Sequence, residues 1–513
     1  LTIPKIFETR TGAARWKNDA CAGFKTYAVD LNWNPALAGA DEYTAGDYAR
    51  KGQGYISTLY IADGLQTALS PINDIWTYDG VYYYIRYCNT FLQYIGDVYN
   101  LRPGELERWT AEVKALKAFY YFELVKRYGP IVLVPQNIDV YAPQHLGKKD
   151  VLTINDKIVK IKDAGSISAD GFLSEAEMIN GEGLLLTPGF IDSHVHVLGG
   201  GGEGGFANRT PEATMEGLTK FGVTTVVGCL GTDGIGRDMC ALVAKTKGLN
   251  EQGMSAYCYT GSYQIPVRTL TDSIVKDIMM IQEIIGTGEI AISDHRSSQP
   301  TFEEFARVVA DTRLGGVLSG KAGIVNVHLG DSPRCLDLIE RVVDETEIPA
   351  SQILPTHINR NEMLFGKSIE YALKGGAVDF TGNEDIDYWE TICDEVRVCN
   401  GIKRMLDAGV NPDRMTISSD GQGSLPMYSS DGEFLGMGVG QSSCLLKEVK
   451  ECVFKTEIPL EIAISTITSN PADILRLKGK GKVEEGYDAD LCILDQELQL
   501  VEVIAKGNTV YTK

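Results

Sequence analysis

The sequence predicts an α/β fold in which a (β/α)8 barrel carries a small β-sandwich domain and follows an α-helical N-terminal segment. Three observations support this fold class. Short apolar segments alternate with helix-like segments through the middle of the chain. Strand-like segments flank that region on both sides, and the first 137 residues have a composition of their own. Alternating strands and helices favour a parallel sheet.

The N-terminal segment, residues 1–137, is aromatic and is predicted to be helical. It holds four of the five tryptophans and none of the six histidines. Within residues 104–129, apolar residues recur at helical spacing through Val113, Leu116, Tyr120 and Leu124, and Gly129-Pro130 ends the run. We expect a buried helix face here and a domain boundary near residue 138.

Strand-like segments occur at residues 151–164 and 489–513, where apolar and polar residues alternate. Two separated strand-rich ends predict one small β-domain built from residues 139–187 and 475–513. Residues 188–474, between these two segments, are predicted to form the barrel.

The central region contains eight strand candidates: residues 188–195, 222–230, 255–262, 289–294, 323–329, 353–358, 377–381 and 415–419. Helix-like segments, such as residues 211–221 and 271–286, separate them. Eight β-then-α units fit a (β/α)8 barrel, in which chemistry takes place at the C-terminal ends of the strands.

Four of the six histidines and one aspartate lie at such strand ends. His194 and His196 can hold one ion together, because side chains at i and i+2 on a strand point the same way. His328, His357 and Asp420 lie at the ends of strands 5, 6 and 8. One histidine in such a place is usually an ordinary core or loop residue, but the set predicts a metal site. Imidazoles and carboxylates suit zinc, and ligand type alone leaves cobalt, nickel or manganese open.

Five ligands exceed the three that a single catalytic zinc usually takes, so we expect two ions and a bridging group. Glu289, at the start of the fourth predicted strand, is the candidate bridge, and a solvated strand-entry residue is the alternative. His145 and His295 fall outside this set. Paired divalent ions lower the pKa of a shared water, so the sequence predicts metal-assisted hydrolysis.

The chain is acidic, with a net charge of -21 and a pI near 4.8. This balance argues against nucleic acid or an anionic membrane as partner. Eleven cysteines without a C-x-x-C pair favour a reducing compartment, and no signal-peptide profile or run of about 18 apolar residues occurs. We expect a cytoplasmic protein, and an outer-membrane location would require a lipoprotein signal ahead of Leu1.

Residues 139–513 resemble isoaspartyl dipeptidases (β-aspartyl peptidases) of the amidohydrolase superfamily. The matching segments are PGFIDSHVHVLGGGGEGG, TPEATMEGLTKFGVTTVVGCLGTD, AISDHRSSQP, LPTHINRN and SSDGQGS. The resemblance implies a small isoaspartyl dipeptide substrate, a homo-oligomer and two divalent metal ions, with zinc the expected metal. It implies this ligand set: His194, His196 and Asp420 for one ion, His328 and His357 for the other. Many members bridge the ions with a carboxylated lysine, and Glu289 stands at that position here.

The resemblance also implies how the substrate is held. Glu203 is implied to bind the substrate ammonium group, and Arg296 and Arg360 its carboxylates, because a guanidinium matches a carboxylate bidentately. Ser424 is implied to add a hydrogen bond to the substrate.

Two residues are implied to act in the reaction itself. Tyr263 would polarise the scissile carbonyl and stabilise its oxyanion. Asp420 would accept a proton from the attacking water and pass it to the leaving amine.

Two alternatives stay open at this point. Other amidohydrolases, such as dihydroorotases, hydantoinases or N-acyl amino acid hydrolases, share the metals and differ in their anion-binding groups. In addition, residues 1–137 resemble part of the SusD/RagB-type outer-membrane proteins that bind glycans, through Tyr84-Ile85-Arg86, Cys88-Asn89, residues 117–122 and Tyr128-Gly129-Pro130.

Overall fold

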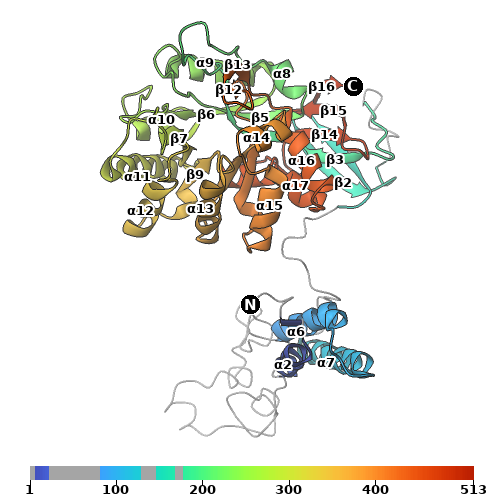
Figure 1. Ribbon diagram of the computed structural model, residues 1–513. Helices are drawn as coiled ribbons and strands as arrows, with labels where there is room; N and C mark the ends of the chain where they lie inside the picture. Colours follow the sequence, from blue (N-terminus) through green and yellow to red (C-terminus); the bar gives the residue numbers. More distant parts are fainter. Residues whose placement is uncertain (1–5, 8, 22–80, 129–145, 168–176) are drawn as a thin grey trace, which may run out of the picture. The chain divides into compact units, whose positions relative to one another are not determined.

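The computed structural model describes residues 6–7, 9–21, 81–128, 146–167 and 177–513 (Figure 1). The chain divides into two compact units, Leu1–Val140 and Tyr141–Lys513. The predicted domain boundary near residue 138 lies outside the described residues, as do His145 and Gly129-Pro130. No helix in the described ranges is both long and apolar enough to cross a membrane.

The described part of the first unit is helical, with elements α2 (Arg10–Cys21), α6 (Val81–Tyr94), η2 (Ile95–Asp97) and α7 (Glu105–Tyr128). The predicted helix over residues 104–129 is observed as α7. Its periodic residues Val113, Leu116, Tyr120 and Leu124 are all buried, in one cluster with apolar residues of α6. The Tyr120 hydroxyl donates to the Ala20 carbonyl at 2.6 Å, which ties α7 to α2.

The second unit is built on eight parallel strands in chain order: β4 (Phe190–Val195), β5 (Val223–Gly228), β6 (Ser255–Thr260), β7 (Ile284–Ile292), β8 (Ile324–Leu329), β9 (Ile353–Thr356), β10 (Val378–Thr381) and β11 (Met415–Ser418). Strands β4 to β9 form one six-stranded sheet, and β10 pairs with β11. The predicted barrel is therefore present, and every strand except β7 starts close to its expected residue.

Backbone contacts complete the ring of strands. The Ile358 amide, just past β9, donates to the Asp379 carbonyl of β10 at 3.4 Å. A parallel bridge joins Val195 of β4 to Gly421, just past β11, and the His196 amide donates to the Gly421 carbonyl at 2.8 Å. The last strand is thus joined to the first at the C-terminal end of the barrel.

The predicted boundary between helix and strand was wrong around β7. Residues 271–286 were expected to be helical, but helix α10 (Ile274–Met280) ends early and β7 begins at Ile284. Parallel pairing with β6 and β8 and burial on both faces of the sheet outweigh the helical spacing of these isoleucines. Glu289 consequently lies inside the strand rather than at its start.

Helices lie around the outside of the strands (Figure 1). In addition to α10 they are α8 (Met215–Thr219), α9 (Met239–Gln252), α11 (Phe302–Ser319), α12 (Asp337–Glu345), α13 (Glu362–Leu373), α14 (Ile386–Ile392), α15 (Val398–Asp407), α16 (Cys444–Phe454), α17 (Leu460–Ser465) and α18 (Ser469–Ile474), with short turns η3 (Ala350–Gln352) and η4 (Pro412–Arg414). A hairpin of β12 (Ser424–Tyr428) and β13 (Phe434–Val439) follows β11.

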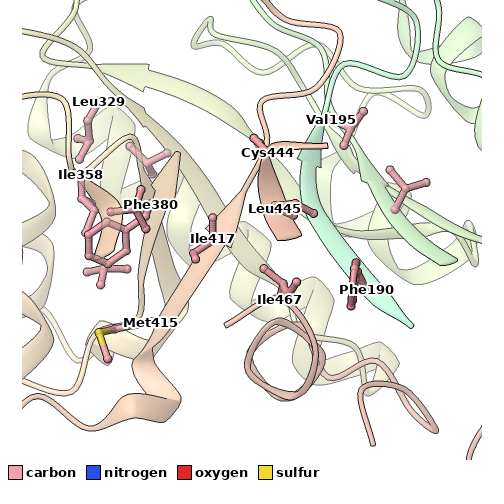
Figure 2. Close-up of a cluster of buried hydrophobic side chains, with 14 of the residues drawn as sticks. Phe190, Val195, Leu329, Ile358, Phe380, Met415, Ile417, Cys444, Leu445 and Ile467 are labelled. Atoms are coloured by element: carbon pink, nitrogen blue, oxygen red, sulfur yellow. The ribbon is translucent and has the colours of Figure 1, made fainter. Parts of the chain in front are cut away.

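Two apolar clusters bury the two faces of the barrel strands. The larger packs outward-facing strand residues against the helices, and Figure 2 shows part of it around Phe380, Ile417 and Leu445. A second cluster gathers alternate strand residues, including Ile191 and Tyr259, with Leu475 and Leu477. Burial on both faces explains why Asp, Glu, Lys and Arg are limited in these eight strands to Asp192, Glu289 and Asp379.

The small β-domain combines both ends of the second unit. Strands β3 (Leu185–Pro188), β14 (Leu491–Leu494), β15 (Leu500–Ala505) and β16 (Asn508–Thr512) form an antiparallel sheet in the order β16-β15-β14-β3. Hairpin β1 (Lys149–Ile154) and β2 (Lys157–Asp163) joins it through the Ile158 amide, which donates to the Tyr487 carbonyl at 2.9 Å. The two segments on either side of the barrel therefore meet, as the alternating patterns predict.

Candidate metal centre

One buried carboxylate lies among four histidines at the C-terminal end of the barrel. Glu289 Oε2 lies 3.2 Å from His194 Nε2, 3.1 Å from His328 Nδ1 and 3.6 Å from His357 Nε2, and its Oε1 lies 3.4 Å from His196 Nε2. Glu289 has no exposed surface. The solvated strand-entry alternative for Glu289 is therefore wrong.

Asp420 approaches the same cluster from the end of β11. Its Oδ1 lies 2.9 Å from His196 Nε2 and 3.7 Å from His194 Nε2. Both Asp420 (φ 48°) and His357 (φ 63°) adopt left-handed backbone conformations just past their strands. Such conformations are uncommon outside glycine and occur often at functional sites.

Several polar atoms in this cluster are buried without a hydrogen bond in the described part of the chain: His194 Nε2, His357 Nε2, Glu289 Oε1 and Asp420 Oδ1. Buried polar atoms are normally paired, so this concentration needs a partner of another kind. Two groups have ligand atoms within 4.8 Å of one another: His194, His196, Cys229 and Glu289, and then Glu289, His328 and His357. The residues fit a divalent metal site.

Partners outside the cluster orient the imidazoles. His194 Nδ1 lies 3.1 Å from Asn326 Oδ1, and His357 Nδ1 lies 2.6 Å from Thr381 Oγ1. These contacts direct each Nε2 at the cluster, and loss of the proton from that nitrogen gives the form of the imidazole that binds metals. Sequence reasoning missed both partners, although Asn326 stands two residues before His328 on the same face of β8.

Cys229 was also missed. It lies one residue past β5, is buried, and its sulfur lies 3.9 Å from His196 Nδ1. A lone cysteine just past a strand carries no signal in the sequence, so only its position beside the histidines distinguishes it.

The electrostatics keep the Glu289 carboxylate charged and the His357 imidazole neutral. Burial alone would raise the pKa of Glu289, but contacts with His194, His328 and His357 hold that pKa well below its usual value. Burial lowers the pKa of His357 to about 3. An ionised carboxylate and a neutral imidazole are both in the state that metal binding requires.

A polar pocket adjoins the cluster and brings together most of the predicted substrate residues. Its lining includes His196, Glu203, Tyr263, Arg296 and Ser424. Arg296 Nη1 lies 3.3 Å from Glu203 Oε1, and the Ser424 hydroxyl donates to Glu203 Oε2 at 3.5 Å.

Tyr263 lines the pocket and contacts the histidine cluster. Its hydroxyl lies 3.0 Å from His328 Nδ1, and the Arg296 guanidinium lies over its ring at 5.3 Å. Burial, assisted by the negative charge of Glu289, raises the pKa of Tyr263 well above its usual value. The phenol therefore keeps its proton and is a hydrogen-bond donor.

The glycine run beside His196 is required by close backbone contacts. A Cβ on Gly199 would lie 2.3 Å from the Thr210 carbonyl oxygen, and one on Gly201 would lie 2.3 Å from the Asn208 carbonyl oxygen. Both glycines also have positive φ, near 80°. Larger residues here would displace the loop that places Glu203 at the pocket.

Two residues stand apart from the pocket. Arg360 follows His357 but is not among the pocket-lining residues; its Nε is buried without a hydrogen bond and lies 3.7 Å from Asp331 Oδ1. His295 turns outward, with 90% of its side chain exposed.

Comparison with solved structures places this architecture among known enzymes. The chain is 43% identical to a β-aspartyl dipeptidase from the thermophilic keratin-degrading Fervidobacterium islandicum AW-1, solved with the dipeptide β-Asp-Leu. That match covers 71% of this chain and 92% of the other, with a TM-score of 0.66. A second β-aspartyl dipeptidase structure from the same organism is 41% identical, covering 73% and 96% of the two chains with a TM-score of 0.64.

Sequence comparisons point to the same class. Residues 319–512 match the model of the amidohydrolase family. An N-acetylglucosamine-6-phosphate deacetylase from Lysinibacillus sphaericus is 25% identical over 379 residues, covering 70% of this chain and 92% of that protein. A barrel with a His/Glu cluster at its C-terminal end and these matches define a metal-dependent amidohydrolase. Within that class, the chain belongs to the β-aspartyl dipeptidase family. These matches lend no support to the SusD/RagB resemblance of residues 1–137.

Proposed function

We propose that this enzyme hydrolyses the β-aspartyl bond of isoaspartyl dipeptides with two divalent metal ions, zinc being the expected metal. The observation that carries the proposal is the single buried carboxylate of Glu289 within 3.6 Å of all four histidines, beside a pocket of mixed charge. Further support comes from the 43% identity to a β-aspartyl dipeptidase solved with β-Asp-Leu.

The proposed ligand set divides between two ions that share Glu289. His194, His196 and Asp420 would hold one, and His328 and His357 the other. When bound, such ions polarise a carbonyl and lower the pKa of a bound water from about 15.7 towards 7. Glu289 has one oxygen near His196 and the other near His328, a placement that supports the bridging role.

Asp420 is proposed to move the proton. Its Oδ1 is buried without a hydrogen bond and lies at the cluster, so it can accept a proton from the attacking water. The same carboxyl group then donates that proton to the leaving α-amine, which departs as a neutral amine. Asp420 would therefore be both a ligand and a general acid-base group.

Tyr263 is proposed to stabilise the oxyanion. Because its phenol stays protonated and reaches His328 at 3.0 Å, it can donate to the oxygen of the scissile carbonyl at the edge of the cluster. A donor already in place costs no reorganisation during the reaction, and one such hydrogen bond typically contributes ~3–4 kcal/mol.

The remaining residues match the charges of an isoaspartyl dipeptide. Glu203 offers a carboxylate to the free α-ammonium group, and Ser424, 3.5 Å away, adds a hydrogen bond. Arg296, in the pocket lining, is proposed to bind one substrate carboxylate. Arg360 lies outside that lining, and its Nε, buried without a hydrogen bond among the described residues, is proposed to reach the other. Glu203 and Arg296 pair with each other at 3.3 Å, so the substrate would exchange this contact for its own ammonium and carboxylate.

The test measures metal content and peptide cleavage together. Purified full-length enzyme should contain two zinc ions per chain after reconstitution and should cleave β-Asp-Leu but not α-Asp-Leu or dihydroorotate. Hydrolysis of dihydroorotate without β-Asp-Leu cleavage would move the enzyme to the cyclic amide hydrolases.

The molecular context is proposed as well. We propose a homo-oligomer in the cytoplasm that acts on small dipeptides, without nucleic acid or membrane partners. The proposed domains are residues 1–137, the barrel at 188–474, and the small β-domain at 139–187 and 475–513. Sedimentation equilibrium tests the oligomer, and a monomer at micromolar concentration would contradict it.

A further inference from the structure

Asp294 is a buried carboxylate that none of the proposed roles uses. It lies two residues past β7, and only 4% of its side chain is exposed. Gly330 packs directly against Asp294, since a Cβ on Gly330 would lie 2.6 Å from the Asp294 Cα and Cβ. The Gln299 side chain also donates to the Asp294 carbonyl at 2.8 Å, so this backbone segment is held from two sides.

One contact of Asp294 leads to the metal cluster. His328 Nε2 lies 3.0 Å from Asp294 Oδ2, while His328 Nδ1 lies 3.1 Å from Glu289 Oε2. An Nε2 hydrogen donated to the carboxylate leaves Nδ1 unprotonated and facing the cluster. Carboxylates in this position orient ligand imidazoles and increase their basicity.

The other contacts of Asp294 lead to the substrate pocket. Its Oδ1 accepts from the Arg296 amide at 2.7 Å and from Arg296 Nε at 3.0 Å, and its Oδ2 accepts from Nη2 at 2.8 Å. Asp294 thus binds the Nε–Nη2 edge of the guanidinium, and Nη1 remains directed at Glu203. Such bidentate contacts fix direction as well as charge.

We propose that Asp294 is a positioning residue that anchors His328 and Arg296 at once, so that one carboxylate links the second metal position to the substrate-carboxylate site. This inference rests on the proposed function. Arg296 Nη2 and His328 Nε2 lie 3.2 Å apart and share Asp294 Oδ2. Without the carboxylate, these two donors would face each other, and both side chains would have to turn.

The experiment uses the full-length enzyme with Asp294→Asn. In the absence of peptide, zinc titration against a competing chelator should show one of two ions bound about 10–100-fold more weakly. At saturating zinc, KM for β-Asp-Leu should rise about tenfold or more, because Arg296 loses charge-assisted contacts, while kcat changes less.

Asp331→Asn is the matched control. Asp331 is also a carboxylate beside a proposed substrate arginine, 3.7 Å from Arg360 Nε, but its side chain is 77% exposed. Exposed pairs contribute little, so both zinc affinity and KM should stay at the wild-type values.

Circular dichroism establishes that the variant is folded. If Asp294→Asn does not fold, Asp294→Glu, which displaces the carboxylate by one methylene, should show the same pair of losses. Wild-type zinc affinity, or a loss confined to zinc affinity or to KM alone, would overturn the shared anchor. A wild-type enzyme that binds two zinc ions without cleaving β-Asp-Leu would instead overturn the proposed function, and the zinc titration would still report on Asp294.

Discussion

Glu289 lies among histidines that are far apart in the chain, because its two oxygens face imidazoles from β4, β8 and the end of β9. A carboxylated lysine would need carbon dioxide to build the same group, whereas a glutamate carries its carboxylate from synthesis. Burial without an adjacent lysine or arginine would normally be costly for such a charge. The cluster of histidines and the metal they imply offset that cost.

Replacing Glu289 with alanine should therefore remove the shared ligand. We expect the Glu289→Ala enzyme to lose at least one of the two proposed metal ions, measured by elemental analysis after gel filtration. His295→Ala is the control, because His295 is a histidine of the same region whose side chain is 90% exposed. Full retention of two ions by Glu289→Ala would exclude the bridge.

A substitution at Asp420 tests the proposed proton transfer separately from metal binding. Asp420→Asn keeps an oxygen that can bind metal but removes the carboxylate that we propose accepts and returns the proton. We expect kcat for β-Asp-Leu to fall by about 10²–10⁴-fold, as for other general acid-base groups, while the protein stays folded. Near-normal turnover with metal still bound would refute the proton-transfer role.

At the scale of elements, helix α11 is held against the turn before β8 by glycine contacts. A Cβ on Gly316 would lie 2.6 Å from the Gly323 Cα and 2.8 Å from its nitrogen, which are backbone atoms that cannot rotate away. The close approach lets α11 cover β7 and β8, the strands that carry Glu289 and His328.

Gly316→Ala should consequently destabilise the enzyme by ~1–3 kcal/mol, the usual range for overpacking. Gly248→Ala in α9 is the matched control, since a Cβ there meets nothing within 4 Å. It should raise stability by up to ~1 kcal/mol through helix propensity. Differential scanning calorimetry should show Tm moving in opposite directions, and equal shifts would contradict the packing argument.

Helix α16 carries a buried acid that links its packing to pH. Burial raises the pKa of Glu448 from 4.5 to about 8, although the Asn383 amide donates to its Oε1 at 3.1 Å. Between pH 4.5 and 8 the folded state keeps the proton that the unfolded chain has lost. Raising the pH in this window therefore favours unfolding, by at most ~1.4 kcal/mol per pH unit.

Glu448→Gln should remove this dependence, because an amide keeps the acceptor and does not titrate. We expect the wild-type Tm to fall relative to that of the variant as the pH rises from 5 to 8. Thermal melts of both proteins across this range measure the difference, and parallel curves would show that Glu448 is ionised in the folded enzyme.

For the whole molecule, the two units have separate cores. The described first unit buries its own aromatic cluster around Tyr120, and every described residue of the candidate site lies within Tyr141–Lys513. A chain of residues 141–513 should therefore bind zinc and cleave β-Asp-Leu as the full chain does. Loss of metal or activity with the truncated chain folded would assign residues 1–140 a part in the site.

Much of this arrangement could be predicted because local patterns carry it. The eight apolar strands, the His194-x-His196 pair and the glycine run are all readable along the chain. The start of β7 could not be predicted, because Ile284 and Ile285 fit a helical pattern equally well. Pairing with β6 and β8 makes them part of the strand. The exposure of His295 was also undetermined, because adjacent residues at a strand end can turn either way.

The sequence by itself determined the class of fold, because strand periodicity is a local property, and it indicated the family through the resemblance of its motifs. Tertiary structure alone decided which atoms meet. Glu289 lies among four imidazoles, Cys229 lies beside His196, and Asp294 contacts both His328 and Arg296. These contacts join residues on different strands, and closure of the barrel sets their distances. No local pattern encodes such distances.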